Sequence, residues 1–119
     1  MSTISEALEE LMSLDGAMGA CLVDSSSGMV LGKTGSGVDL DLAAAGNTEV
    51  VRAKLKTMKA MGIKGEIEDI LITLNIQYHI IRPMIKHEGL FVYVVLDRGK
   101  SNLALARRKV NDVESSINI

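Results

Sequence analysis

The chain has 119 residues and a formal net charge of -2, and 47% of its residues are hydrophobic. This length fits one domain over residues 1–119, and the hydrophobic content suffices for a core. The balanced charge and the 3% of aromatic residues argue against a nucleic-acid binder. A single cysteine, Cys21, excludes an internal disulfide and favours a reducing compartment. The sequence shows neither a signal peptide nor an apolar run long enough to span a membrane, so we expect a cytoplasmic protein without membrane insertion.

The first element is predicted to be an amphipathic helix. Thr3 and Glu6 have the spacing of a capping box, in which each side chain accepts a hydrogen bond from a free backbone N–H group of the first turn. Apolar side chains then recur on one face from Ile4 to Met12, as on a helix that covers a core. Gly16 suits the left-handed conformation that often ends a helix.

A hairpin and a second, longer helix follow. Residues 17–23 and 29–31 are predicted strands joined by the turn formers of residues 24–28, and the glycine-rich stretch 32–38 is predicted to be a loop. Asp39 or Asp41 can cap a helix that runs to about Met61. This helix carries two stripes at helical spacing. The apolar stripe is Ala44, Val51, Leu55 and Met58, and the basic stripe is Arg52, Lys56 and Lys59. Gly46-Asn47 predicts a kink or a close contact within the helix.

The remaining chain predicts three strands and a final helix. Residues 67–74, 77–85 and 90–96 are rich in β-branched side chains, and their short connections indicate an antiparallel meander. The third of these strands is apolar on both faces, which places it centrally. An apolar stripe runs from Leu103 to Ile117, with Ser101 or Asn102 as the cap. The predicted fold class is therefore α/β (α+β): elements in the order α-β-β-α-β-β-β-α, forming one five-stranded, mainly antiparallel sheet with helices on both faces.

Gly32-Lys33-Thr34 suggests a phosphate-binding loop, but the pattern is incomplete. That motif needs a glycine five residues before Gly32, and Ser27 stands there. The preceding Met29-Val30-Leu31 has the character of a strand, whereas phosphate binding requires a loop of free N–H groups. We therefore favour a strand end that runs into a glycine-rich loop.

The other candidate residues favour structural roles. His79 and His87 lack the spacing of metal ligands, so strand packing or surface exposure is favoured. Cys21 lies in an apolar run of small residues, which favours a buried, inert thiol over a nucleophile. Asn102 is explained as a helix cap, and Arg82, which precedes Pro83 on a strand, is favoured as structural over catalytic. We predict no catalytic residue, no metal site and no cofactor.

The element order and three local sequences resemble the roadblock/dynein light chain family. The first is Cys21-Leu22-Val23-Asp24 followed by Gly28-Met29-Val30-Leu31, the opening hairpin. The second is Tyr78-His79-Ile80-Ile81-Arg82-Pro83, which is similar to the apolar-Arg-Pro strand of the family. The third is Ser101 to Arg107, which is similar to the start of its last helix. The resemblance runs from about Ile4 to Ile117, and the opening turn departs from it by using three serines where Asp-Gly is frequent.

This resemblance implies a profilin-like sheet with strand order 2-1-5-4-3 and dimers that pair their third strands and pack their second helices. The expected dimer interface is Ile70, Leu71, Ile72, Thr73, Val51, Leu55 and Met58. Arg52, Lys56 and Lys59 are candidates for contact with an acidic partner, although a solvated helix face is an equal alternative. The implied function is a non-enzymatic, dimeric module that regulates or scaffolds a small Ras-like GTPase. The alternative hypotheses are a small-molecule sensor or general scaffold of the same fold, and an enzyme.

Overall fold

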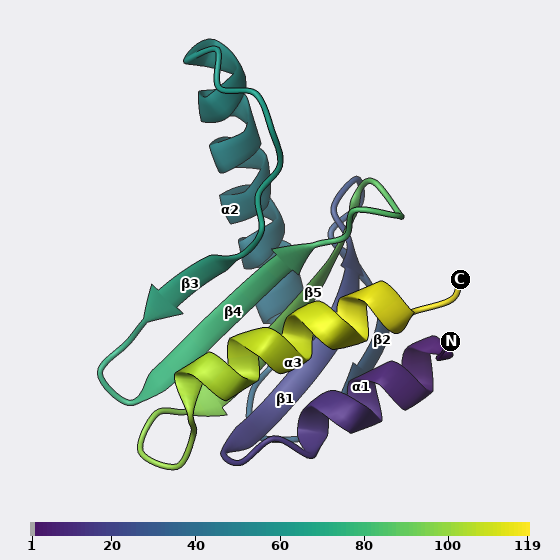
Figure 1. Cartoon of the computed structure of the whole chain (residues 1–119), viewed down its shortest axis with the longest axis vertical. Helices are drawn as coiled ribbons and strands as arrows, with labels where there is room; N and C mark the ends of the chain where they lie inside the picture. Colours follow the sequence, from purple (N-terminus) through teal and green to yellow (C-terminus); the bar gives the residue numbers. More distant parts are fainter. Residues whose placement is uncertain (1) are drawn as a thin grey trace.

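The computed structural model describes residues 2–119 and shows a five-stranded antiparallel sheet with three helices (Figure 1). The elements in chain order are α1 (Ile4–Met12), β1 (Ala17–Asp24), β2 (Met29–Thr34), α2 (Leu40–Ala60), β3 (Ile70–Thr73), β4 (Gln77–Pro83), β5 (Leu90–Asp97) and α3 (Leu103–Ser116). The sheet order is β2-β1-β5-β4-β3. This α+β fold confirms the predicted element order, the central position of β5 and the strand order implied by the resemblance.

Local side-chain chemistry sets where the helices begin. Thr3 and Glu6 form the predicted capping box of α1. Asp39 accepts a hydrogen bond from the N–H of Leu42 and caps α2, and Asn102 caps α3 in the same way. In each case a free backbone donor of the first helical turn gains a partner. Among residues 2–119, no helix is both long and apolar enough to cross a membrane.

The two faces of the sheet carry separate layers of core. Helices α1 and α3 lie side by side on one face, and α2 lies on the other (Figure 1). Strand β5 is buried on both faces, because its alternate side chains join the two hydrophobic clusters in turn. The cluster beneath α2 includes Tyr93, Cys21 and Val51. The sheet therefore supports the first half of α2 firmly.

The hairpin differs from the prediction at its second strand. Strand β2 continues to Thr34, so the predicted loop begins at residue 35 and not at Gly32. A bulge lets it continue: Leu22 pairs with Gly32 and Val23 pairs with Val30, which leaves Leu31 as the extra residue. A Cβ atom on Gly32 would lie 2.7 Å from the side chain of Ile4, so a larger residue there would displace that side chain, and glycine favours the close approach of α1.

The segment around β3 also differs from the prediction. Regular pairing with β4 covers only Ile70–Thr73 instead of residues 67–74, and the chain before it returns irregularly beside α2 (Figure 1). Strand β4 ends at Pro83 rather than at residue 85. The close contact predicted at Gly46 is absent within residues 2–119, because nothing lies within 4 Å of a Cβ atom placed there.

Helix α2 extends past the sheet. Thr48 and Val51 are its last buried residues, and from Arg52 to Ala60 every residue except the half-buried Met58 is exposed. Figure 1 shows this second half projecting beyond the strands. A helix of this kind obtains most of its stability from packing, so the projecting half marks a surface that the rest of the chain leaves uncovered.

Candidate interaction surface

Strand β3 forms an outer edge of the sheet and carries no charge. Its sequence is Ile-Leu-Ile-Thr, and three of its four residues are half-buried. In monomeric proteins, charges, bulges or proline normally prevent an edge strand from pairing with other chains, because a free edge pairs readily with other strands. The opposite edge, β2, has such protection in its bulge and in Lys33. The unprotected edge of this sheet is therefore β3.

A face of small residues on α2 lies beside the β3 edge. Gly46, Val50, Ala53, Thr57 and Ala60 alternate at spacings of three and four, which places them along one side of the helix. All five are exposed. We call this set the small-residue face. Such residues let a second helix approach closely, because no long side chain holds it away.

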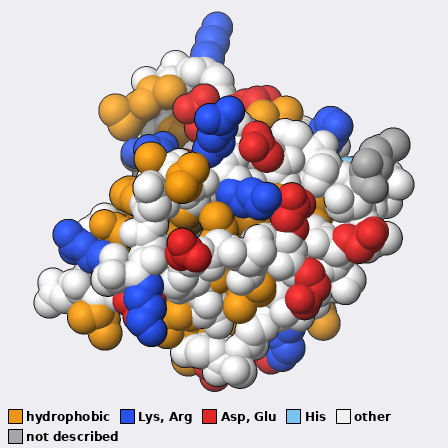
Figure 2. Space-filling view, turned by 60° about the horizontal axis from the view of Figure 1, so that its bottom comes forward, with side chains coloured by type: hydrophobic (Ala, Val, Ile, Leu, Met, Phe, Trp, Pro, Cys, Tyr) orange, Lys and Arg blue, Asp and Glu red, His pale blue; other side chains and the backbone are white. Residues whose placement is uncertain are grey.

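An open groove of about 610 Å³ separates the small-residue face from the segment that enters β3. Its lining residues are Val50, Ala53, Lys54, Thr57, Ile67, Asp69 and Ile70. The groove is mainly apolar and lies on the surface, whereas small-molecule sites enclose most of their ligand and present converging polar groups. Figure 2 shows hydrophobic side chains exposed near the projecting end of the molecule, with basic side chains among them.

The predicted interface residues are distributed over core and surface. Val51 is only 3% exposed and belongs to the core beneath α2, so it offers little surface to the predicted dimer interface. Leu55 is 47% exposed. In β3, Ile70 and Ile72 pack toward the cluster under α2, whereas Leu71 packs toward the cluster under α1 and α3. The small-residue face was not predicted from the sequence, because only the bulkiest apolar residues of the helix signal burial by their spacing.

The predicted basic residues lie together on the exposed surface of α2. Arg52, Lys56 and Lys59 are all exposed, on a side of the helix next to the small-residue face. Arg52 approaches Glu49 at 3.8 Å, an ion pair that is open to solvent. The projecting end, residues 50–65, contains no acidic residue. Its basic residues are Arg52, Lys54, Lys56, Lys59 and Lys64, so this end carries a concentrated positive charge although the chain as a whole is acidic.

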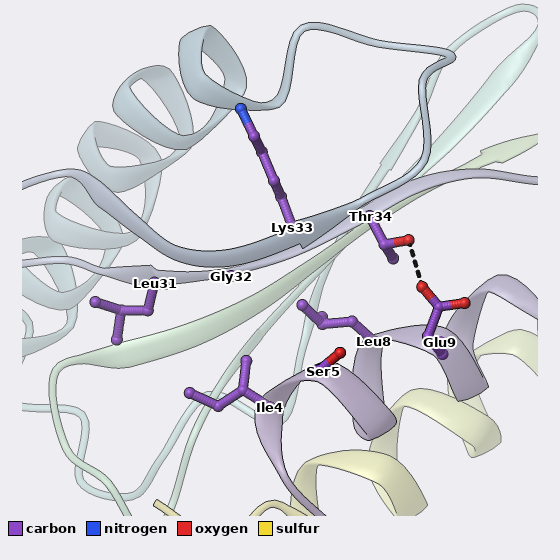
Figure 3. Close-up of a pocket in the computed structure, with 8 residues that line it drawn as sticks. All are labelled: Ile4, Ser5, Leu8, Glu9, Leu31, Gly32, Lys33 and Thr34. Atoms are coloured by element: carbon purple, nitrogen blue, oxygen red, sulfur yellow. Dashed lines mark hydrogen bonds between the residues drawn. The ribbon is translucent and has the colours of Figure 1, made fainter.

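A second, smaller hollow of about 300 Å³ lies between α1 and β2 (Figure 3). Lys33 points away from this hollow toward α2, where its Nζ donates to Oδ2 of Asp41 at 2.7 Å. The hydroxyl of Thr34 donates to Oε1 of Glu9 at 2.8 Å across the hollow. Because Gly32, Lys33 and Thr34 belong to a paired strand, their backbone does not form the loop of free N–H groups that a phosphate site needs.

The histidines and the cysteine are held in the structure as packing residues. Nε2 of His79 donates to Oε1 of Gln77 at 2.8 Å, and its Nδ1 accepts from the hydroxyl of Tyr93 at 2.9 Å. Burial lowers the pKa of this histidine. The Cys21 side chain is buried, as predicted, and burial raises the pKa of its thiol to about 12, which disfavours the reactive thiolate. His87 is half-buried in the turn before β5. No cluster of metal-ligating side chains occurs among residues 2–119.

Arg82 has the structural role that the sequence favoured. It is 9% exposed, and its Nε donates to Oε1 of Glu114 at 2.9 Å. Its Nη1 donates to the carbonyl oxygen of Glu68 at 2.8 Å. Asn102 is the helix cap, again as predicted. The acidic partner Glu114 was not identified from the sequence, because 32 residues separate the pair and no local pattern joins them.

Comparison with known structures identifies the fold. No family model and no curated protein matches the sequence. The roadblock/LC7 domain from Streptomyces avermitilis matches with a TM-score of 0.80 and 16% identity, over 97% of this chain and 94% of that one. The chain has the roadblock fold. Myxococcus xanthus MglB matches it with a TM-score of 0.82 and 18% identity, over 94% of this chain and 82% of that one.

A third roadblock-fold structure, the gliding protein MglB from Thermus thermophilus, matches with a TM-score of 0.72 and 18% identity. It covers 94% of this chain and 88% of the other. At this identity the likeness establishes the fold, and it confirms the architecture that the resemblance implied. The surface formed by α2 and β3 therefore belongs to a known roadblock framework.

Proposed function

We propose that this chain is a non-enzymatic interaction module that dimerises and regulates or scaffolds a small Ras-like GTPase. One observation carries the proposal: the uncharged β3 edge adjoins the small-residue face of a projecting helix. Together they form one continuous uncovered surface on a roadblock fold. An exposed surface of this composition favours association with another protein.

A second copy of the same chain is the occupant that fits this surface. β3 of one copy can pair antiparallel with β3 of the other about a two-fold axis. This pairing satisfies the free edge of both copies and limits the assembly to a dimer. The same axis sets the two α2 helices beside each other, and the small-residue face lets them pack closely.

The partner surface in this arrangement is the basic side of α2. Arg52, Lys56 and Lys59 remain exposed at the rim of the paired helices, and two copies double their positive charge. An acidic patch on a GTPase is attracted to such a rim, which raises the association rate. The implied GTPase role of the resembled family and the likeness to the MglB structures support this choice of partner.

Direct binding to purified GTPases tests the proposal. Small Ras-like GTPases from the source organism are loaded separately with GDP and with a non-hydrolysable GTP analogue, and their binding to the immobilised chain is measured by interferometry. We expect one of them to bind, with a preference for one nucleotide state, because a regulator must distinguish the states that it controls. Failure of every GTPase to bind in either state contradicts the proposal.

The GTP hydrolysis rate of the bound GTPase, measured with and without the chain, separates the possible roles. A faster rate indicates a regulator of hydrolysis. An unchanged rate with retained binding indicates a scaffold. Heat-denatured chain is the control for nonspecific effects on the assay.

A further inference from the structure

Two arginines on the α3 side of the sheet hold the segment that leads into β3. We infer that Arg82 and Arg107 form a clamp that positions the β3 edge and the adjoining groove wall for self-association. This inference rests on the proposed dimer, and it assigns a positioning role to residues that lie outside the surface itself.

The outer part of the clamp joins α3 to Asp69. Arg107 donates from Nε to Oδ2 of Asp69 at 2.8 Å and from Nη2 to Oδ1 at 3.0 Å. This two-pronged geometry fixes the carboxylate in direction as well as in distance. The side chain of Asp69 is 13% exposed and that of Arg107 is 48% exposed, so the bond is formed at the edge of solvent.

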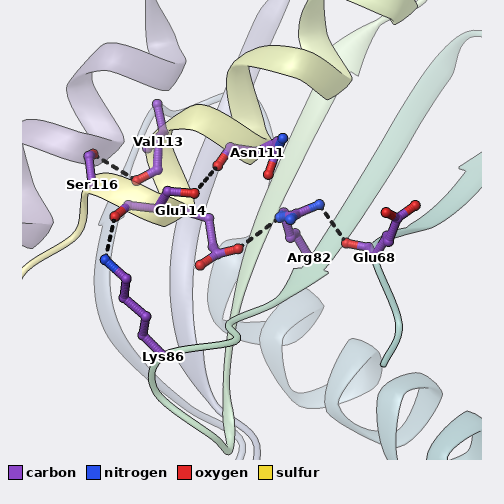
Figure 4. Close-up of polar contacts among 8 residues, drawn as sticks. Glu68, Arg82, Lys86, Asn111, Val113, Glu114 and Ser116 are labelled. Carbon is purple, nitrogen blue, oxygen red and sulfur yellow. Dashed lines mark hydrogen bonds and ion pairs between the residues drawn. The ribbon is translucent and has the colours of Figure 1, made fainter. Parts of the chain in front are cut away.

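The inner part of the clamp is buried. The guanidinium group of Arg82 lies between Glu114 of α3 and the backbone of Glu68, and it donates to both (Figure 4). The side chain of Glu114 is 3% exposed, so helix packing fixes the carboxylate that orients Arg82. The two arginines therefore hold two consecutive residues, Glu68 through its carbonyl oxygen and Asp69 through its side chain.

The held segment has little other support. Residues 61–69 form neither helix nor strand, and β3 itself is four residues long. A segment with so few backbone hydrogen bonds opens easily unless side chains restrain it. The clamp supplies this restraint immediately before Ile70, where pairing with β4 begins.

The same segment faces the groove on its other side. Ile67, Asp69 and Ile70 line the groove opposite the small-residue face. Because the two clamped residues, Glu68 and Asp69, stand between the apolar groove residues Ile67 and Ile70, the arginines fix the position of this groove wall. Loss of the clamp is expected to loosen the wall and the edge strand together, while the core clusters stay intact.

The test compares Arg107→Ala with Lys100→Ala by analytical ultracentrifugation. Lys100 is exposed and lies outside the hollow that Arg107 shares with Glu68 and Asp69, and both substitutions remove one positive charge. We expect Arg107→Ala to raise the dimer dissociation constant by about tenfold or more, which corresponds to about 1.4 kcal/mol. Lys100→Ala should stay within about twofold of wild type. Arg107→Lys should fall between them, because lysine keeps the charge but lacks the two-pronged donor.

Amide hydrogen exchange over residues 66–73 gives a readout of position that is separate from dimer strength. Arg107→Ala should accelerate exchange there and leave the melting temperature close to that of Lys100→Ala. Equal dissociation constants for Arg107→Ala and Lys100→Ala would overturn the clamp while leaving the proposed dimer in place. A wild-type chain that remains monomeric would overturn the proposed dimer and, with it, the role of the clamp in self-association.

Discussion

Arg82 and Glu114 form the most deeply buried ion pair described in residues 2–119, with side chains 11% and 3% exposed. We expect Glu114→Ala to lower the free energy of unfolding by about 3 kcal/mol, because it leaves the guanidinium charge of Arg82 in the core without its carboxylate. Urea unfolding measures the loss. The double variant Arg82→Met/Glu114→Ala should lose much less than the sum of the two single variants. Additive losses would show that the two residues act independently.

The Cys21 thiol makes the stability depend on pH in the alkaline range. Its pKa rises from 9.0 to about 12 in the folded chain, so between these pH values the unfolded chain releases a proton that the folded chain keeps. Stability is therefore full below pH 9 and falls as pH rises, by up to about 1.4 kcal/mol per pH unit. Urea unfolding from pH 8 to 10.5 should show a steeper decline for wild type than for Cys21→Ala. Parallel declines would contradict the burial of this thiol.

Residues whose role is local could be predicted from the sequence. The caps Thr3, Asp39 and Asn102 were recognisable because each acts on a backbone group within three residues of itself. The clamp could not be predicted, since Arg107 and Asp69 are 38 residues apart. Only the fold brings such residues together.

At the scale of elements, the pairing of β2 argues against a nucleotide-binding site in the chain. Gly32, Lys33 and Thr34 belong to a paired strand, and Lys33 is engaged with Asp41. We therefore expect that the chain does not bind nucleotides and that millimolar GTP or ATP with magnesium leaves the melting temperature unchanged. A nucleotide that bound only the folded state would raise it. A rise of several degrees, measured by differential scanning fluorimetry, would show a nucleotide site in the chain itself.

The order of elements was predictable, but some of their limits were not. Strand β2 extends beyond its apolar residues, because the bulge at Leu31 keeps Gly32 to Thr34 in register with β1. Strand β3 is shorter than its apolar run, since Ile67 lies in the segment held beside α2 and contributes to the groove. In both strands, pairing with the neighbour decides the boundary, and composition alone does not reveal it.

Helix α2 shows the same division between local and long-range information. Its periodicity placed Ala44 and Val51 on one apolar stripe, and both are buried. The sequence could not show that the sheet ends beneath Val51, which leaves Leu55 exposed. Nor did it distinguish the small-residue face from ordinary helix surface, because alanine and threonine are common on both.

At the scale of the whole molecule, the charge of α2 should govern partner binding separately from folding. We expect the double reversal Arg52→Glu/Lys56→Glu to weaken GTPase binding at least tenfold, while the dimer and the melting temperature stay nearly unchanged. Interferometry at several salt concentrations measures the effect, and added salt should slow wild-type association. The control is Lys86→Glu/Lys100→Glu, which makes the same charge change at exposed sites away from α2 and from the clamp. Undiminished binding of the first variant would place the partner elsewhere.

The central claim is that β3 and the small-residue face of α2 join two copies of the chain. Sedimentation velocity at micromolar concentration tests it on wild type, Ala53→Glu and Ala45→Glu. Both alanines are exposed on α2, but only Ala53 belongs to the small-residue face, where a glutamate would meet its own copy across the two-fold axis. The account predicts a dimer for wild type and Ala45→Glu and a folded monomer for Ala53→Glu. A monomeric wild type, or a dimer that Ala53→Glu leaves intact, would contradict it.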